Sequence, residues 1–223
     1  MKTPLHNKST IAEIKERFDR DVDRFSDIES GQQAVIDAPL MLELISGLAI
    51  RIKPDAENIL DIGCGAGNNT IKLLREKPGL NCDLSMLERA RERVSREGAG
   101  DIRTFEGDFR EAALPSGHYD IIVAAAALHH LRDDDDWIGC FEKIYSLLRP
   151  RGVLVVSDMV HHEHEAVQDA MWNRYGIYLE SLGGKDYRDE VFEYIDLEDS
   201  PRSVTFQIEL MKKTGFSSVD IIH

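Results

Sequence analysis

Four residues within one short string have the types and spacing of a ligand-binding turn: Asp61, Gly63, Gly65 and Gly67 in D-I-G-C-G-A-G. Glycines permit positive φ angles and let a ligand approach the main chain closely. The preceding residues are apolar, as in a buried strand, and the following residues have helical periodicity, so unpaired helix N–H groups adjoin the turn. A dinucleotide site prefers G-x-G-x-x-G, and an acid here would repel pyrophosphate. The pattern therefore predicts a ligand with a cationic group.

The string also resembles the first motif of the class I S-adenosylmethionine (SAM) methyltransferases. In that family the glycine turn passes under the amino-acid end of SAM. The resemblance implies that SAM is the cofactor and that its methionine end is held by the four residues Asp61, Gly63, Gly65 and Gly67. The alternative is a tight turn in some other α/β protein.

A second acid, Asp83, lies 16 residues after Gly67 at the end of an expected strand over 80–85. Two carboxylate oxygens match a vicinal diol, so we predict that Asp83 binds the ribose hydroxyls. The segment is shorter than the second strand of the family, which indicates a truncated strand or residues absent from the sequence.

A third acid, Asp108, follows an expected strand over 101–106. The resembled family places an E-G-D segment beside adenine, which implies that Asp108 accepts the exocyclic amine and that Phe109 covers the ring. The alternative for Asp108 is a turn residue that caps 110–113. Ala125, in the expected fourth strand, completes the predicted cofactor site.

Five of the eight histidines follow two expected strands that are neighbours in this fold: His129, His130, His161, His162 and His164. Ligands bind outside the carboxyl ends of parallel strands, and imidazole can accept a proton near neutral pH. His129 and His161 are therefore the candidate catalytic bases. Imidazoles also bind transition metals, with Asp158, Glu163 or Glu165 as further ligands. Local packing and an exposed helix start explain the same residues, and we predict no metal.

The alternation of expected strands and helices along the chain indicates an α/β protein with a Rossmann-like, doubly wound, mostly parallel sheet of six to seven strands. Three further strands are expected over 119–126, 153–157 and 216–222. Between them, four acids from Asp133 to Asp136 suit a helix N-terminus, with a cation site as the alternative.

The whole chain, 1–223, is predicted to be a single SAM-binding domain, with N-terminal lid helices over 10–52, a core over 58–158 and a helical cap insertion over 159–200. A capping box from Thr10 and Glu13 should begin the first helix, 10–25. The second helix, 33–52, should break or start late at Pro39. The insertion should break at Gly183-Gly184.

The net charge of 27 − 41 = −14 makes nucleic acid an improbable partner. The longest apolar run is far too short for a membrane span, and the first residues lack the apolar core of a signal peptide. The three cysteines show no metal spacing, and a reducing cytoplasm fits them. The oligomeric state is open, with a homodimer as one option.

The predicted function is methyl transfer from SAM to a small molecule, with Trp172, Tyr175 and Tyr178 as candidate lining residues of the acceptor pocket. A helix core explains these aromatic residues as well. A competing function is that of carboxy-SAM synthase, an accessory enzyme of tRNA modification that the chain also resembles. That enzyme uses an arginine in its last helix, where this chain has Leu210. A metal-binding protein that uses the histidines and a non-catalytic SAM sensor are two more possibilities.

Overall fold

A computed structural model of the chain describes residues 3–10, 13–14, 16–17, 34–85, 88–105 and 107–223. Contacts divide the chain into two compact units. The sheet unit consists of Lys15–Ala127 and Glu142–Asp158. The helical unit consists of Met1–Ile14, Leu128–Phe141 and Met159–His223, and it contains the whole predicted insertion over 159–200.

The sheet unit is built on a parallel sheet in the order β3-β2-β1-β4-β5. β1 (Asn58–Ile62) lies at the centre between β2 (Asn81–Ser85) and β4 (Tyr119–Ala125), and β3 (Ile102–Phe105) and β5 (Leu148–Ser157) are the edges. β1 is buried along its whole length, and β4 is buried except at its last residue. Such continuous apolar burial is typical of central strands in α/β sheets.

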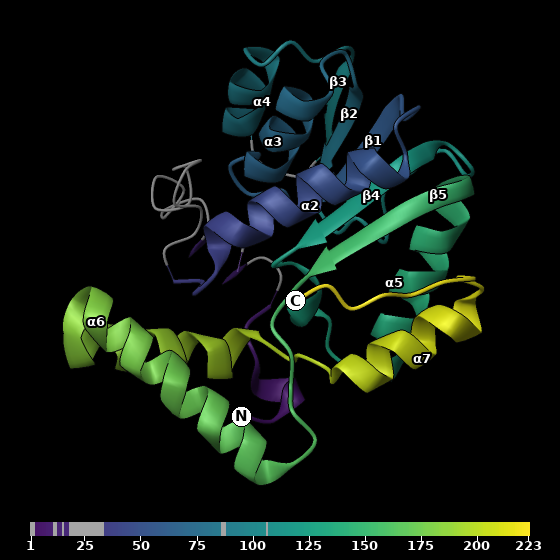
Figure 1. The fold of residues 1–223 in the computed structure, drawn as a ribbon. Coiled ribbons are helices and arrows are strands. Elements are labelled where there is room, and N and C mark those ends of the chain that lie inside the picture. Colours follow the sequence, from purple (N-terminus) through teal and green to yellow (C-terminus); the bar gives the residue numbers. More distant parts are fainter. Residues whose placement is uncertain (1–2, 11–12, 15, 18–33, 86–87, 106) are drawn as a thin grey trace. The chain divides into compact units, whose positions relative to one another are not determined.

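Three helices line one face of this sheet: α2 (Ala38–Ile52), α3 (Asn68–Glu76) and α4 (Glu88–Ser95) (Figure 1). Side chains such as Ile45, Ile59, Leu74 and Val123 from the first two helices and the central strands form one buried cluster. α2 begins at Ala38 with Pro39 in its first turn, which confirms the predicted late start. β2 has five residues, as β1 does, and pairs with both of its neighbours.

The predicted sixth strand over 216–222 is wrong, and so is the count of six to seven strands: the described residues form a five-stranded sheet. No residue from 216 to 223 is assigned to a strand, and Ile221 and Ile222 are exposed. A strand is stabilised by its ladder and by burial of alternate side chains. Ser217, Ser218 and Asp220 contribute little of either.

The helical unit contains a 3-10 turn, η1 (Leu5–Asn7), another, η3 (Leu128–His130), and two helices, α6 (Glu165–Glu198) and α7 (Val204–Thr214). α5 (Asp134–Leu147) begins in this unit and ends in the sheet unit. The acids Asp134 to Asp136 occupy its first turn, which confirms the predicted helix start. Gly184 has non-helical φ and ψ angles inside α6, so the predicted break is confirmed too.

The predicted helix over 10–25 lies largely outside the described residues. Its start is described, and there the predicted capping box is confirmed. The Thr10 N–H donates to Glu13 Oε2 over 2.7 Å, and the Glu13 N–H donates to Thr10 Oγ1 over 3.3 Å.

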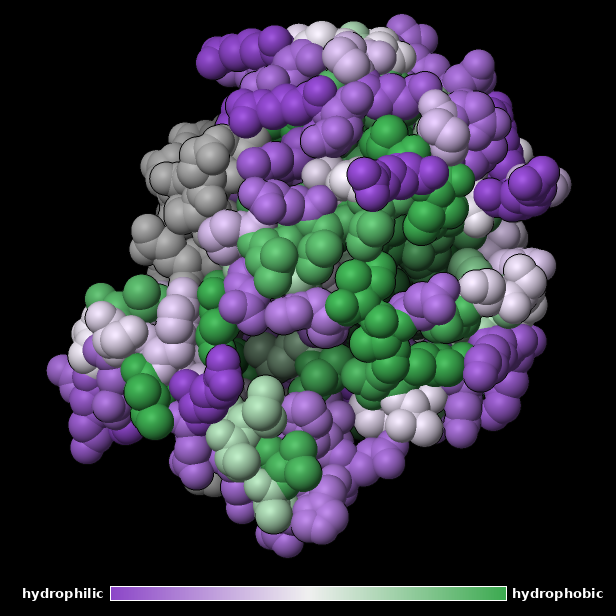
Figure 2. All heavy atoms as spheres, in the orientation of Figure 1, coloured by the Kyte–Doolittle hydropathy of each residue, from purple (hydrophilic) through white to green (hydrophobic). Residues whose placement is uncertain are grey.

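Hydrophobic residues reach the surface along the edge strand β5, where Val153 to Val156 are only partly buried (Figure 2). Elsewhere on this face, polar and charged residues dominate the surface of the sheet unit. Among the described helices, none has the length and apolar character that a membrane crossing requires.

Candidate functional site

The glycine turn joins the C-terminal end of the central strand β1 to the start of α3 (Figure 1). Gly63, Gly65 and Gly67 all have positive φ angles, of 65°, 53° and 80°. Gly67 is the N-cap of α3, and its N–H donates to the Cys64 carbonyl over 2.8 Å. The turn is also tied to the neighbouring strand, because the Cys64 N–H donates to the Ser85 carbonyl over 3.3 Å. The sequence therefore builds a hydrogen-bonded turn with positive φ angles at the carboxyl end of the central strand, where α/β proteins bind ligands.

Gly63 and Gly65 serve different purposes in this turn. A Cβ atom at Gly63 would lie 2.9 Å from Ala127 Cβ, so this glycine is needed for packing. A Cβ atom at Gly65 would meet nothing within 4 Å, although the residue has a positive φ angle. The main chain at Gly65 is thus open to an approaching ligand.

The acid before the turn, Asp61, is fully buried at the centre of the sheet. Thr70 Oγ1 of α3 donates to Asp61 Oδ2 over 2.7 Å. Burial raises the pKa of Asp61 to about 7, and the Thr70 hydroxyl opposes this shift only in part. Its other oxygen, Oδ1, is buried and accepts no hydrogen bond from any residue that the structure describes. A cationic hydrogen-bond donor from a ligand would satisfy this oxygen and favour the carboxylate.

A second acceptor near the turn was not predicted from the sequence. Asn69 Oδ1, in the first turn of α3, is buried and has no hydrogen-bond donor within the described ranges. The helix pattern of 68–77 places Asn69 at a helix start, where an asparagine is ordinary, so only the buried oxygen distinguishes it.

Asp83 lies within β2, opposite Leu60 of β1, two residues before the strand ends. Its buried carboxylate accepts a hydrogen bond of 2.5 Å from the Tyr119 hydroxyl. The Arg103 guanidinium is 3.1 Å away on the other side. The role of Asp83 towards ribose stays a prediction, and it requires that the carboxylate exchange at least one of these partners for the diol.

Asp108 is engaged by its own neighbour Arg110, whose Nε lies 2.9 Å from Asp108 Oδ2. Burial raises the pKa of Asp108, but the hydrogen bonds from Arg110 outweigh it and hold this pKa below its ordinary value. The Arg110 N–H also donates to Asp108 Oδ1, which supports the interpretation of Asp108 as a turn residue. Phe109 is buried beneath the Lys143 ammonium group, which is 5.8 Å from the ring centre. Ala125 ends β4. The contacts of Asp108, Phe109 and Ala125 with the cofactor stay predictions.

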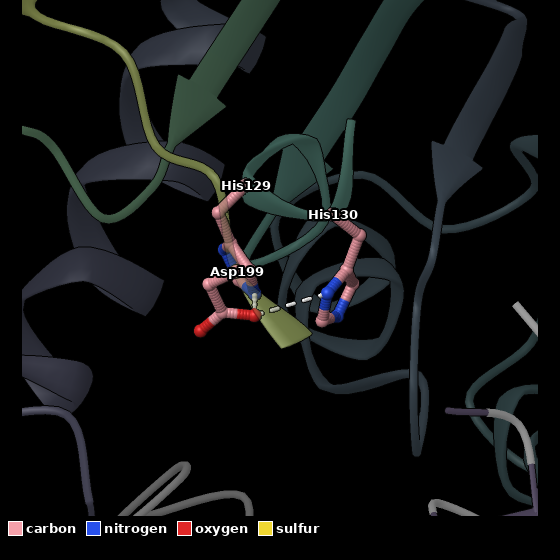
Figure 3. A group of neighbouring side chains, drawn as sticks. All are labelled: His129, His130 and Asp199. Atoms are coloured by element: carbon pink, nitrogen blue, oxygen red, sulfur yellow. Dashed lines mark ion pairs between the residues drawn. The ribbon is translucent and has the colours of Figure 1, made fainter. Parts of the chain in front are cut away.

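A second group of chemically capable side chains lies in the helical unit. His129 and His130 of η3 point towards Asp199, which follows α6 (Figure 3). Asp199 Oδ1 is 3.1 Å from His130 Nδ1 and 3.7 Å from His129 Nε2. The three ligating atoms lie within 4.8 Å of one another, and the Asp199 side chain is buried.

His161, His162 and His164 lie outside this group and have other local contacts. His164 is the N-cap of α6, and its Nδ1 accepts from the Ala166 N–H over 3.2 Å. The main-chain N–H groups of His161 and His162 donate to Arg202 O and Gln168 Oε1. The helix-start interpretation is confirmed for His164, whereas His161 and His162 lie in the irregular segment before α6. The catalytic roles of His129 and His161 stay predictions.

The acids expected to join the histidines are engaged elsewhere. Glu163 accepts from the Ser203 hydroxyl over 2.8 Å, and Asp158 accepts from the Ala127 N–H over 3.3 Å. The acid that does join them, Asp199, lies 69 residues after His130 and was not predicted. No periodicity or motif connects the two positions, so only the folded chain reveals the pair.

The aromatic residues of α6 pack within the helical hairpin that the Gly184 break creates. The Trp172 ring is 4.8 Å from Phe192 and the Tyr175 ring is 5.8 Å from Phe192, between centroids. A Cβ atom at Gly176 would lie 3.3 Å from Arg188, so the two arms approach closely there. These contacts support the helix-core interpretation of Trp172 and Tyr175.

Comparison with known proteins now adds to this geometry. Residues 59–152 match the family model of a methyltransferase domain. This match spans the glycine turn, the strands β1 to β4 and the start of β5. The match supports a class I SAM-dependent methyltransferase, and SAM is the cofactor of that enzyme class.

Individual relatives agree on the class. The chain is 25% identical over 190 residues to carboxy-S-adenosyl-L-methionine synthase of Vibrio atlanticus, covering 81% of this chain and 77% of that protein. It is 24% identical over 227 residues to demethylmenaquinone methyltransferase of Lactococcus lactis, covering 96% and 84%. It spans about half the length of several other curated methyltransferases that it matches.

The fold is shared with solved structures. A putative sarcosine dimethylglycine methyltransferase from Galdieria sulphuraria superposes with a TM-score of 0.62 at 21% identity, over 91% of this chain and 74% of that one. At this identity the likeness concerns the fold, an α/β Rossmann-like sheet with helices.

Proposed function

We propose that this chain transfers the methyl group of SAM to a small-molecule acceptor. The observation that carries the proposal is the pairing of an open turn at Gly65 with the buried, unsatisfied Asp61 Oδ1. The ammonium group of the methionine end would donate to this oxygen, and the open main chain would lie against the same part of the ligand.

Methyl transfer asks the protein mainly for positioning. SAM supplies a methyl carbon that its sulfonium already makes electrophilic. The chain holds the donor through Asp61 and the glycine turn, with Asp108 and Phe109 as our assignments beside adenine. An acceptor that is not already ionised must give up a proton as the bond forms, and His129 and His161 stay our candidates for the base that takes it.

The small-molecule class of the acceptor is supported by the names of similar proteins. The Lactococcus relative is named for demethylmenaquinone, and the Galdieria structure for sarcosine and dimethylglycine. The net charge of −14 also opposes a polyanionic acceptor. Homodimer formation and a cytoplasmic location stay predictions.

A second candidate function is that of carboxy-SAM synthase, which the Vibrio relative favours. The extra carboxylate of that product needs a cation, because a buried charge without a partner is costly. Where carboxy-SAM synthase is expected to have an arginine in its last helix, this chain has Leu210, a buried residue of α7. This substitution is why we favour transfer of the methyl group.

The test combines mass spectrometry with turnover. The nucleoside that co-purifies with the protein is identified by mass, and release of S-adenosylhomocysteine is then measured with pools of amines, phenols and carboxylic acids. We expect unmodified SAM or S-adenosylhomocysteine and acceptor-dependent release. Recovery of a nucleoside heavier by a carboxyl group would assign the chain to carboxy-SAM synthase instead.

A further inference from the structure

The carboxylate of Asp199 is buried, unlike that of an ordinary surface acid. Its side chain is only 3% exposed. Its Oδ1 atom accepts no hydrogen bond from any described residue, although His130 Nδ1 lies 3.1 Å away. A buried carboxylate oxygen without a hydrogen bond is costly, and a bound cation would offset that cost.

The distances from Asp199 to the two histidines match what a metal ion requires. With bonds of 2.0–2.1 Å, neighbouring ligand atoms around tetrahedral zinc are about 3.3 Å apart. The two distances from Asp199 Oδ1, 3.1 Å to His130 Nδ1 and 3.7 Å to His129 Nε2, bracket that value. Both imidazoles point towards the Asp199 carboxylate (Figure 3).

We propose that His129, His130 and Asp199 form a binding site for one first-row divalent transition metal, with zinc as the preferred ion. This replaces our expectation from the sequence, which predicted no metal and did not include Asp199. Two imidazoles and one carboxylate are a ligand set that such ions accept. Three protein ligands leave a fourth position for water or for an oxygen of a bound molecule. The site lies wholly in the helical unit. It shares His129 with the candidate bases of the proposed methyl transfer, but metal binding is measured without turnover, so the two proposals can fail separately.

Main-chain contacts hold the two segments that carry the ligands. The Ser200 N–H, next to Asp199, donates to the His129 carbonyl over 2.6 Å. The Lys8 ammonium group donates to the carbonyl of Asp199 over 2.5 Å and to that of Asp196 over 3.0 Å. The ligands are therefore positioned by their own backbones before any ion binds.

Two cations near the carboxylate limit the affinity of the site. Lys8 and Arg132 both interact electrostatically with Asp199. Arg132 hydrogen-bonds the main-chain carbonyls of Glu198 and Ser9. Because these charges repel a metal ion, we expect weaker binding than in a dedicated structural zinc site.

The test is a titration of untagged full-length protein that has been stripped with a chelator. Zn²⁺ binding is measured by calorimetry, and Co²⁺ binding by its visible absorption, which reports nitrogen and oxygen ligation. We expect one equivalent of either ion per chain. Asp199→Asn and His130→Gln should each weaken this binding roughly tenfold or more, while the control His162→Gln, a histidine outside the group, should leave it unchanged.

The unfolding temperatures of the metal-free variants show whether each variant is folded, so that loss of a ligand can be distinguished from loss of the fold. If Asp199→Asn does not fold, His130→Gln carries the comparison, because its amide retains the polarity and much of the volume of imidazole. Unchanged binding in the folded variants would overturn the proposal. So would the absence of a stoichiometric site in the wild-type protein, or an equal loss in His162→Gln.

Discussion

The glycine turn after β1 and the His129–His130–Asp199 cluster are built in opposite ways. The turn takes all its key residues from one string, Asp61 to Gly67, between a strand and a helix. The cluster joins η3 to a carboxylate 69 residues further along the chain. A contiguous site can be recognised from spacing alone, whereas a cluster of distant residues depends on the packing of the helices that carry them. The predictions below test whether the two sites are as separate in function as in construction.

The largest effect is expected from Gly65→Val, which should abolish SAM binding. A β-branched side chain would occupy the open space above the turn and oppose a φ angle of 53°. Calorimetry with SAM measures the loss. The matched control is Gly98→Val, since Gly98 also has a positive φ angle, of 79°, and nothing within 4 Å of its Cβ position. Equal SAM affinities in the two variants would show that SAM does not bind against Gly65.

Asp61→Asn should stabilise the ligand-free protein at pH 8. The pKa of Asp61 in the folded chain, about 7, is above its ordinary value, so its contribution to stability is complete below about pH 4 and is lost as the pH rises through 7. A difference of about three units corresponds to at most about 4 kcal/mol. Denaturant unfolding of both proteins across this pH range measures it.

The same variant should bind SAM more weakly, because an amide cannot neutralise an ammonium group. Wild-type affinity for SAM should also rise as the pH increases through about 7, where Asp61 ionises. An asparagine variant that is no more stable at pH 8 than at pH 5, relative to wild type, would contradict the burial argument.

Gly63→Ala should lower the free energy of unfolding by about 2 kcal/mol, through overpacking and the positive φ angle. The new methyl group would lie 2.9 Å from Ala127 Cβ. Gly65→Ala should cost about half as much, since only the φ angle opposes it. Chemical denaturation without ligand measures both losses. A larger loss in Gly65→Ala than in Gly63→Ala would contradict the close approach of Gly63 to Ala127.

The smallest effects are expected in the histidines. His129→Ala should lower turnover several-fold while leaving SAM affinity nearly unchanged, and the more exposed His161→Ala should have a weaker effect of the same kind. Steady-state kinetics with an identified acceptor, combined with SAM calorimetry, distinguishes the two parameters. Full turnover in both variants would leave these histidines with structural roles alone.

The sheet unit was largely predictable because its elements are encoded locally. The apolar run before the glycine turn predicted β1, and the helical periodicity after it predicted α3. The expected strand over 80–85 matches β2 within one residue. β5 begins at Leu148 rather than at 153, because the Arg149–Gly152 segment before the expected strand continues it beside Tyr119 across an irregular register. The sixth strand failed for the related reason that a strand needs a partner, which the residues 216–222 alone do not specify.

In the candidate site too, locally encoded features could be predicted and features that depend on the folded chain could not. Asp61 and the glycines could be assigned from their spacing, but the pKa of Asp61 and its unsatisfied oxygen depend on burial by the whole sheet. For Asp83, the position in the sequence suggested a ribose ligand. It did not reveal that Tyr119 and Arg103 already contact the carboxylate in the folded chain. Asp199 could not be found, since nothing in the sequence relates it to His130.

The most direct test of the central claim is a calorimetric titration of the wild-type protein with SAM and with S-adenosylhomocysteine, with metal content assayed on the same sample. Both nucleosides should bind at one site per chain with micromolar affinity, whether or not metal is present. Failure of both to bind a folded sample would contradict it, and would leave the histidine cluster as the site to pursue.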